Sequence, residues 1–321
     1  MSHVYVVRFA IRSGVIFSFF CFGAVAAYPQ SEVPNSNAMP FGMPSVLTVS
    51  KEVQEVSLIL TVVDHRGRFV SNLSRSDFTI WDNGELPKRI TYFENQTNLP
   101  LRVAVVLDTS DSVGQSIHFE QKAAAMFLKH ILRPGSDLAL IIGFNDEARL
   151  LQGPTSDTGL LSNVIRSLRV GGYTAIYDAV SAASQELGKI KDIQQSRRIV
   201  IVITDGADNH SHISLQQAAE VAQRNDSFVY IMSTNPSTSN RLDEQDRAMK
   251  QLSEATGGNF LRADSEDQIR NAFSKIDKEL RSQYAIGYKP ANASPNGLFH
   301  HLAVFGPKKL HLFHRQGYFA R

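Results

Sequence analysis

Hydrophobic and polar residues alternate along the segment that begins at Val53, as they do in strands with one buried face. The apolar positions of its first strand are Val56, Leu58, Leu60 and Val62. Two more strands are predicted at 77–81 and 89–93, and Asn83-Gly84 between them is typical of a type I′ hairpin turn. The result is a β module of roughly 45 residues, which is too small to be stable alone.

From residue 99 the pattern changes to alternating strands and helices. Leu101–Leu107 is an almost continuous apolar run, as expected for a parallel strand buried on both faces. Further strands are expected at 138–144, 148–151, 199–204, 228–233 and 259–261, and helices at 160–168, 176–187, 215–224, 243–255 and 267–281. Another helix is expected between the first two strands, with Phe119, Ala123, Phe127 and Ile131 on one face and its end at 133–135. This order predicts an α/β fold, with a doubly wound, mostly parallel central sheet and helices on both faces.

β character returns at 283–319, where Tyr284, Ile286 and Tyr288 alternate with small or polar residues. We hypothesise that this segment pairs with 53–93 to form one small β-sandwich, with the α/β domain inserted between the two. The predicted division of the chain is a signal peptide at 1–27, a linker at 28–50, an N-terminal β module at 51–97, the α/β domain at 99–282 and a C-terminal β segment at 283–321.

The N-terminus has the composition of a secretory signal peptide. Arg8 and Arg12 precede a short apolar run that ends in the small residues 24–27. The run is shorter than the ~20 apolar residues needed to cross a bilayer, although an uncleaved anchor remains an alternative. We therefore expect a secreted or periplasmic protein with no membrane span after cleavage. Cys21 lies in the apolar run without a preceding small-residue lipobox, so we expect it to be removed.

The composition favours a globular protein and argues against nucleic-acid binding. The chain has 321 residues, of which 43% are hydrophobic and 20% charged, which is typical of a globular protein. Its 33 Lys and Arg nearly balance 31 Asp and Glu, and signal cleavage would remove two Arg, so a nucleic-acid binder is not expected. With a single Cys, the chain forms no intramolecular disulfide framework.

Candidate chemistry begins where the strand at 101–107 ends. The loop Asp108-Thr109-Ser110-Asp111-Ser112 offers one carboxylate and two hydroxyls from the Asp-x-Ser-x-Ser positions, and such oxygen donors suit Mg²⁺ or Ca²⁺. In doubly wound sheets, ligands bind beyond the carboxyl ends of the strands. Two later junctions add Thr174, just before a helix, and Asp205, just after the strand at 199–204.

This combination resembles the von Willebrand factor type A family and its metal-ion-dependent adhesion site. The positions that match the motif are Asp108, Ser110, Ser112, Thr174 and Asp205. The resemblance covers 99–282. The flanks resemble an acidobacterial family related to von Willebrand factor A, on segments 62–68, 77–78, 82–84, 281–284 and 316–320.

Two positions depart from the family pattern. Asp111 stands where relatives often have Gly and adds a negative charge beside the metal loop. Tyr173 separates a Gly pair from Thr174, whereas many relatives run directly from Gly to Thr, so Tyr173 could shift the loop that carries Thr174.

The resemblance implies a module that binds proteins through a metal ion. In the family, Mg²⁺ (or Ca²⁺ or Mn²⁺) keeps a coordination position that an acidic side chain of a partner protein takes. We thus expect a non-enzymatic adhesion protein of a bacterial envelope. One alternative is a structural envelope component in which the metal only stabilises the fold. Another is a Mg²⁺-dependent hydrolase with Asp108 as nucleophile, although the second Asp that such enzymes carry two positions on is Ser110 here.

Other polar residues are expected to have structural roles. Asp146 and Asp157 are predicted in hairpin turns, and Asp178 is predicted either to support the metal loop or to have no part in it. Near Asp205, the residues Asp208, His210 and His212 are expected to line the partner surface, with a transition-metal site as the alternative. A solvated strand face is predicted for His300, His301, His311 and His314.

Overall fold

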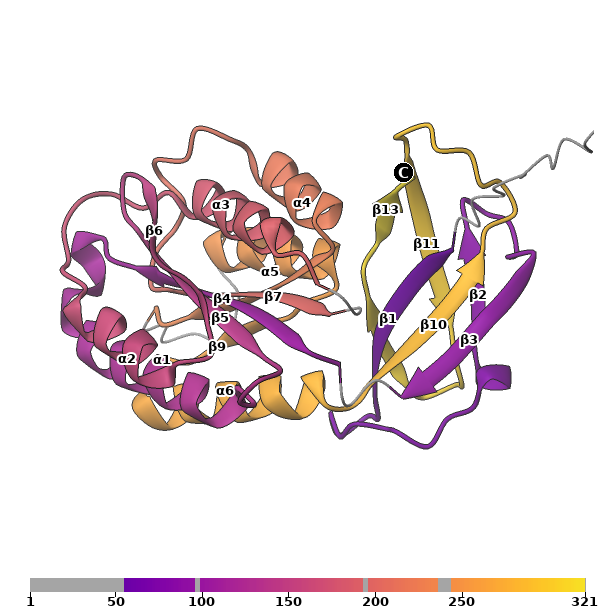
Figure 1. Ribbon diagram of the computed structural model, residues 1–321, viewed down its shortest axis with the longest axis horizontal. Helices are drawn as coiled ribbons and strands as arrows, with labels where there is room; N and C mark the ends of the chain where they lie inside the picture. The colour runs from indigo at the N-terminus through magenta and orange to yellow at the C-terminus, as the bar shows by residue number, and fades with distance from the viewer. Residues whose placement is uncertain (1–54, 96–98, 193–195, 236–243, 321) are drawn as a thin grey trace, which may run out of the picture. The chain divides into compact units, whose positions relative to one another are not determined.

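The computed structural model describes residues 55–95, 99–192, 196–235 and 244–320 (Figure 1). The predicted signal peptide at 1–27 and linker at 28–50 lie outside these residues. The described residues belong to one compact unit. Within the described part of the chain, no helix combines the length and apolar character needed to cross a membrane.

A six-stranded sheet with the order β6-β5-β4-β7-β8-β9 forms the centre of the α/β domain. Its strands are β4 (Leu101–Asp108), β5 (Leu138–Phe144), β6 (Ala148–Thr155), β7 (Arg197–Thr204), β8 (Ser227–Ser233) and β9 (Phe260–Arg262). Every neighbouring pair is parallel except β5 and β6. This confirms the doubly wound, mostly parallel sheet that the alternating pattern predicted.

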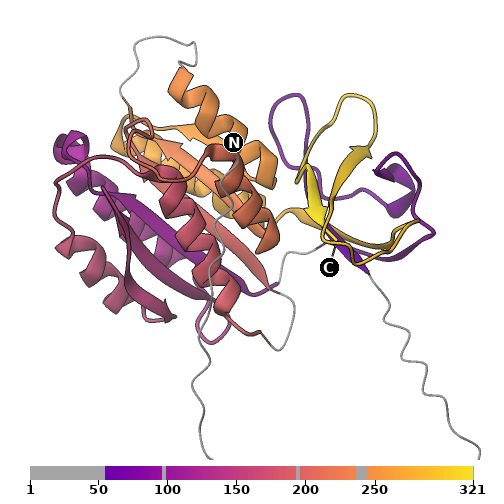
Figure 2. The same cartoon turned by 90° about the horizontal axis from the view of Figure 1, so that it is seen from above.

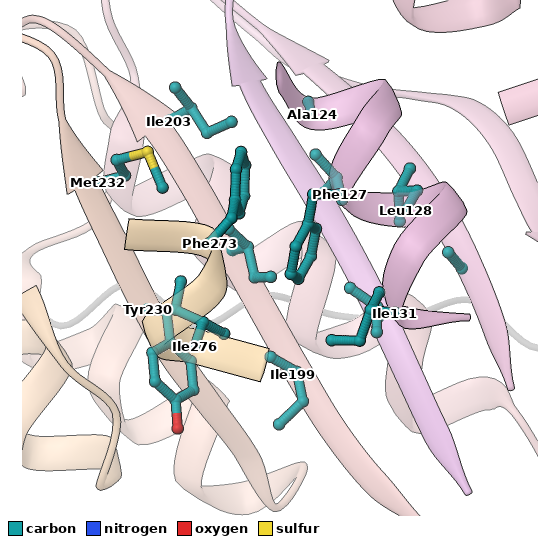
Figure 3. Close-up of a cluster of buried hydrophobic side chains, with 14 of the residues drawn as sticks. Ala124, Phe127, Leu128, Ile131, Ile199, Ile203, Tyr230, Met232, Phe273 and Ile276 are labelled. Atoms are coloured by element: carbon teal, nitrogen blue, oxygen red, sulfur yellow. The ribbon is translucent and has the colours of Figure 1, made fainter. Parts of the chain in front are cut away.

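Helices cover both faces of this sheet (Figures 1 and 2). One layer consists of α1 (Ile117–Ile131), α2 (Thr158–Ser167) and α6 (Glu266–Leu280), and the other of α3 (Ile176–Lys189), α4 (Leu215–Arg224) and α5 (Glu244–Thr256). Figure 3 shows the core of the first layer, where Phe127 of α1 and Phe273 of α6 stack with ring centroids 4.3 Å apart. Replacing either ring by Ala is expected to cost about 3–5 kcal/mol.

The β module has two antiparallel sheets that share one hydrophobic core. Their orders are β12-β1-β10-β3 and β13-β11-β2. The strands are β1 (Val56–Val63), β2 (Thr79–Asp82), β3 (Arg89–Asn95), β10 (Gln283–Lys289), β11 (Phe299–Phe305), β12 (His311–His314) and β13 (Gly317–Phe319). Because β1 pairs with β10 and β12, and β2 with β11, the hypothesis of one sandwich built from both ends of the α/β domain is confirmed. The domain boundaries themselves stay predictions.

The hairpin predicted around Asn83-Gly84 is only partly present. Asn83 and Gly84 have φ of 50° and 80°, as a type I′ turn requires, and Asp82 forms a bridge with Glu85. The flanking strands, however, do not pair with each other, because β2 joins β11 while β3 joins β10 in the other sheet. Each strand thereby places its apolar face in the shared core, which the local turn signal does not reveal.

The solvated face predicted for four C-terminal histidines is wrong for one of them. His301 and His311 are exposed and His314 is half-buried, but His300 is only 7% exposed. The phase of β11 explains this, because alternate residues of a strand point to opposite faces and Leu302 is buried against the core.

Candidate metal centre

The predicted loop follows β4, in the middle of the sheet. From β4 the chain continues to β5 on one side, whereas from β7 it continues to β8 on the other. The carboxyl ends of β4 and β7 therefore flank the point where the strand order reverses, which is where open α/β sheets bind ligands. Asp108 ends β4 and Asp205 directly follows β7, so both carboxylates stand at this point.

Asp108 is completely buried and accepts hydrogen bonds only from neutral donors. The backbone N–H of Ser110 donates to Oδ1 over 2.8 Å, and the hydroxyl of Thr204 donates to Oδ2 over 2.5 Å. Burial raises the pKa of Asp108 to about 6, since these hydrogen bonds compensate only part of the desolvation, and the nearby charge of Asp205 raises it further. The chain thus holds a carboxylate that its own residues stabilise poorly.

The two serines connect Asp108 to Asp205. Ser110 Oγ lies 3.1 Å from Ser112 Oγ, and the Ser112 hydroxyl donates to Asp205 Oδ1 over 2.7 Å. A short 3-10 helix at Asp111–Gln115 holds Ser112 in this position. Hydrogen bonds thus link four of the five predicted ligands, and the link to Asp108 is made by the backbone N–H of Ser110.

Thr174, the fifth predicted ligand, reaches the same place from another loop. It is 3% exposed, and a Cβ placed on Gly206 would lie 3.7 Å from Thr174 Oγ1 and 3.9 Å from Ser112 Oγ. The hydroxyls of both residues thus border one point beside Asp205. The structure brings together all five residues that the motif indicated.

Residues at the β5–β6 turn hold the loop that carries Thr174, a role that the sequence did not reveal. Asn145 donates from its side chain to the carbonyl of Gly171 over 2.7 Å, and Asp146 Oδ1 accepts from the N–H of Tyr173 over 2.7 Å. Gly172 has φ of 96°, and a Cβ there would come within 2.8 Å of the Asp146 carboxylate. Only glycine fits this position.

Neither departure from the motif displaces a predicted ligand. The Tyr173 side chain is 63% exposed and stacks on the ring of His210 with centroids 5.1 Å apart, while Thr174 stays buried beside it. Asp111 is exposed, and its N–H donates to the carbonyl of Gly172 over 3.1 Å. Both side chains belong to the rim of the site.

Asp178 supports the loop that follows Asp205. It accepts from the backbone N–H groups of His212 and Ile213, and its Oδ2 lies 2.8 Å from His212 Nδ1. Burial alone would raise the pKa of Asp178, but the hydrogen bonds from His212 outweigh it and lower the pKa. Asp208 similarly accepts from Tyr177 N–H over 3.3 Å and from the Ser211 hydroxyl.

Asp157 has a different role from the one predicted. Instead of forming a hairpin turn, it is the N-cap of α2, where its Oδ1 accepts from the N–H groups of Gly159 and Leu160. The side chain thereby satisfies helix donors that have no partner inside the helix.

Glu120 is a further acid near the site that the motif did not include. It lies on the buried face of α1, and its Oε1 accepts from the Thr234 hydroxyl over 2.7 Å. Burial raises its pKa to about 7, and the charges of Asp108 and Asp205 add to the shift. Its Oε2 is buried without a hydrogen-bond partner. The signal in the sequence is a glutamate among the apolar positions of a predicted helix.

The donor set fits a hard divalent cation. It consists of the carboxylates of Asp108 and Asp205 and three hydroxyls, and oxygen ligands of this kind suit Mg²⁺, Mn²⁺ or Ca²⁺. Within the described ranges, no group of three or more His, Cys, Asp or Glu residues is arranged to hold a metal ion. A transition-metal site built on His210 and His212 is therefore not found among these residues, and any metal at the predicted site would depend on the hydroxyl groups.

Comparisons with known proteins identify a family for the part of the chain that contains this loop. Residues 103–207 match the family model of the von Willebrand factor type A domain. That segment begins in β4 and ends just after Asp205, so it contains all five predicted ligands. No curated protein matches the chain.

Among solved structures, a von Willebrand factor type A protein from Catenulispora acidiphila is 11% identical, with a TM-score of 0.49 over 74% of this chain and 71% of that one. An aerotolerance-related membrane protein from Bacteroides fragilis is 18% identical, with a TM-score of 0.46 over 56% of this chain and 98% of that one. Proximal thread matrix protein 1 from the mussel byssus, solved with a zinc-occupied MIDAS motif, is 15% identical, with a TM-score of 0.49 over 62% of this chain and 50% of that one.

Proposed function

Residues 103–207 form a von Willebrand factor type A domain, and on this premise we propose that the chain binds a partner protein through a divalent cation. The proposed ligands are Asp108, Ser110, Ser112, Thr174 and Asp205. Mg²⁺ is the proposed ion, with Mn²⁺ or Ca²⁺ as substitutes, and the partner is proposed to supply an acidic side chain.

One observation carries the proposal: acidic groups gather at the switch point, and no Lys or Arg among the described residues forms an ion pair with Asp108, Asp205 or Glu120. Asp108, Asp205 and Glu120 accept hydrogen bonds from Ser, Thr and backbone N–H groups. Burying a carboxylate without a compensating charge destabilises the folded state. A bound cation would compensate the charge of the buried Asp108 and of the neighbouring Asp205.

The chain's own residues have separate tasks in this proposal. Asp108 supplies the most deeply buried charge, and Thr204 fixes one of its oxygens so that the other side of the carboxylate faces the loop. Ser110 and Ser112 supply neutral oxygens, and Ser112 also orients Asp205. Mg²⁺ and Ca²⁺ bind about six or more oxygen ligands, and the chain offers five side chains. A bound ion would therefore keep a coordination position for a carboxylate from outside.

We further propose that the protein acts outside the cytoplasm. This part depends on the signal peptide predicted at 1–27, which lies outside the described residues. The proposal assigns no catalysis to the chain.

Calorimetric titration of the protein, expressed without residues 1–27, tests the metal site. Mg²⁺ and Mn²⁺ are each expected to bind with one ion per chain, and Asp108→Asn is expected to lower the affinity at least tenfold. Asp267→Asn is the matched control, because Asp267 is an exposed acid on α6 with one surface ion pair. Equal affinities in all three proteins would contradict the assignment.

Capture from the envelope fraction of the source organism tests the partner. With Mg²⁺ present, we expect a set of captured proteins that is lost with EDTA and with Asp108→Asn, while circular dichroism of the protein is unchanged. If EDTA lowers the melting temperature but leaves the captured set the same, the metal only stabilises the fold and the adhesion function is wrong.

A further inference from the structure

The β module also holds a buried carboxylate, in a cluster that the metal site does not use. Asp82, at the end of β2, is 4% exposed. Its Oδ1 lies 2.7 Å from His300 Nδ1, and its Oδ2 accepts from the hydroxyls of Tyr288 and Tyr318 over 2.9 and 2.7 Å. The four residues come from β2, β10, β11 and β13, so the cluster joins the two sheets of the module.

The hydrogen bonds of this cluster determine which nitrogen of His300 carries the proton. The single hydroxyl hydrogen of Tyr318 is donated to Asp82, so at its 3.2 Å contact with His300 Nδ1 the tyrosine oxygen accepts. Nδ1 therefore bears a hydrogen, which it shares between Asp82 and Tyr318. In the neutral ring, Nε2 is left as a hydrogen-bond acceptor.

Burial keeps the two tyrosines in their donor form. Desolvation, together with the charge of Asp82, raises the pKa of Tyr288 and of Tyr318 well above the ordinary value. Both hydroxyls hence stay protonated at physiological pH and continue to stabilise the ionised Asp82. The tautomer of His300 is fixed under these conditions.

His300 also lines a pocket of about 240 Å³. The other lining residues are Asp82, Asn83, Glu85, Ala291, Asn292, Ser294 and Asn296. Only Asp82 and His300 among them are buried, so the pocket opens to solvent and has these two residues on its inner side. The lining contains two carboxylates and no Lys or Arg.

We propose that this pocket binds a ligand through a primary ammonium or guanidinium group. The group would donate to His300 Nε2 and to the carboxylate of Glu85, whose Oε2 already accepts from Asn292 Nδ2 over 2.9 Å. Both kinds of group are cationic and carry several N–H donors, which matches a pocket rich in acceptors and negative in charge. An anionic ligand would meet no compensating charge, and a metal ion would find too few carboxylate and imidazole ligands here.

Titration of a chain of residues 52–321 with two probes tests the proposal. L-Argininamide and n-butylammonium represent the two groups, while glucose and acetate represent neutral and anionic ligands. We expect isothermal titration, and shifts of backbone amide resonances at 82–85 and 291–300, to report binding of one or both cations and not of glucose or acetate.

Two variants and one control locate the binding. Glu85→Gln and His300→Asn are each expected to weaken binding of the cation at least tenfold. His301→Asn is the matched control, since His301 is exposed on the opposite face of the same strand. Glu85 lies on an exposed turn, so its variant tests the site even if His300→Asn does not fold.

Three results would overturn the proposal: neither cation binds the wild-type chain, glucose or acetate binds as tightly as the cations, or Glu85→Gln binds as the wild type does. None of these depends on the metal site, and Asp108→Asn is expected to bind the cations normally.

Discussion

Asp108 and Asp137 are buried to the same degree at opposite ends of β4, but the chain treats their charges differently. Asp137 lies where β4 begins and accepts from the N–H of Leu101 over 2.8 Å. Arg133 donates to it from its backbone, from Nε and from Nη2, each over 2.9 Å. Burial would raise the pKa of Asp137, but the bonds from Arg133 and Leu101 outweigh it and lower the pKa. Asp108 has no such partner, and its pKa rises to about 6.

The contrast distinguishes a structural carboxylate from a functional one. When a guanidinium pairs with a buried acid, the chain's own residues compensate the charge, and the hydrogen bonds between the two groups stabilise the fold. A buried acid held only by neutral donors costs folding free energy, and such costs concentrate at functional sites. Asp108 and Asp137 are equally buried, so the direction of the pKa shift is what distinguishes them.

The largest effect is expected from Asp137→Ala. Removing the buried carboxylate takes away the acceptor of the backbone N–H groups of Leu101 and Arg133, so the free energy of unfolding should fall by about 3–5 kcal/mol. Urea denaturation in EDTA measures it, with Asp267→Asn as the control. A loss smaller than that of an ordinary surface variant would remove the basis of the comparison.

Asp108→Asn is expected to act in the opposite direction. In EDTA at neutral pH, the variant should be more stable than wild type by up to about 3 kcal/mol, since the neutral amide avoids the desolvation that the raised pKa of Asp108 reports. With saturating Mn²⁺ the order should reverse, because only the wild type gains from the ion. If Asp108→Asn unfolds at lower urea than wild type in EDTA, Asp108 is a structural acid like Asp137.

The pH dependence of stability should report Glu120. Its folded-state pKa is raised from 4.5 to about 7, so the folded chain holds a proton that the unfolded chain has lost between these values. Stability in EDTA should therefore fall as pH rises through this window, with a slope of up to about 1.4 kcal/mol per pH unit from this one group.

Glu120→Gln should flatten that slope above about pH 6, where Asp108 no longer contributes. Urea midpoints in EDTA measured from about pH 4 to about pH 8 check this. Asp267→Asn is the control, because Asp267 is an exposed acid on α6, away from the metal loop. Identical slopes for wild type and Glu120→Gln would contradict the assignment.

The smallest effect is expected from Tyr173→Ala. The ring is exposed and only stacks on His210, so stability should change by less than about 0.5 kcal/mol. Mn²⁺ affinity should stay within about twofold, since Thr174 is held by Asn209 and by the loop backbone. A tenfold loss of Mn²⁺ affinity would show that the inserted tyrosine positions Thr174 after all.

Sequence patterns predicted the α/β domain and the five proposed ligands because both depend on local signals. Continuous apolar runs such as Leu101–Leu107 identify buried parallel strands, and the ligands follow strand ends, which the topology brings to one edge. The sandwich was also predictable in outline, since neither β segment could bury its apolar face alone.

The sequence did not predict which strands pair when they lie far apart along the chain. Asn83-Gly84 forms its turn, yet β2 pairs with β11 more than two hundred residues away, and no local pattern encodes that choice. The burial of His300 follows from the same pairing. Glu120 was not predicted because the Asp-x-Ser-x-Ser motif ends at Ser112. Glu120 comes near Asp108 only when α1 packs against the sheet.

Because the sandwich is built from two segments far apart in the sequence, it can form only late in the synthesis of the chain. Gln283 of β10 contacts Thr61 of β1 across 222 positions, so the first strands leave the ribosome long before their partners exist. Until then β1 and β3 expose unpaired edges, which are prone to aggregate. The α/β domain between them is complete earlier, and its folding brings the two segments within reach and shortens the loop that must close. A chain that stops before Gln283 is expected to fold its α/β domain, including the candidate metal centre, and to lose solubility, because β1 and β3 then lack their partner strand.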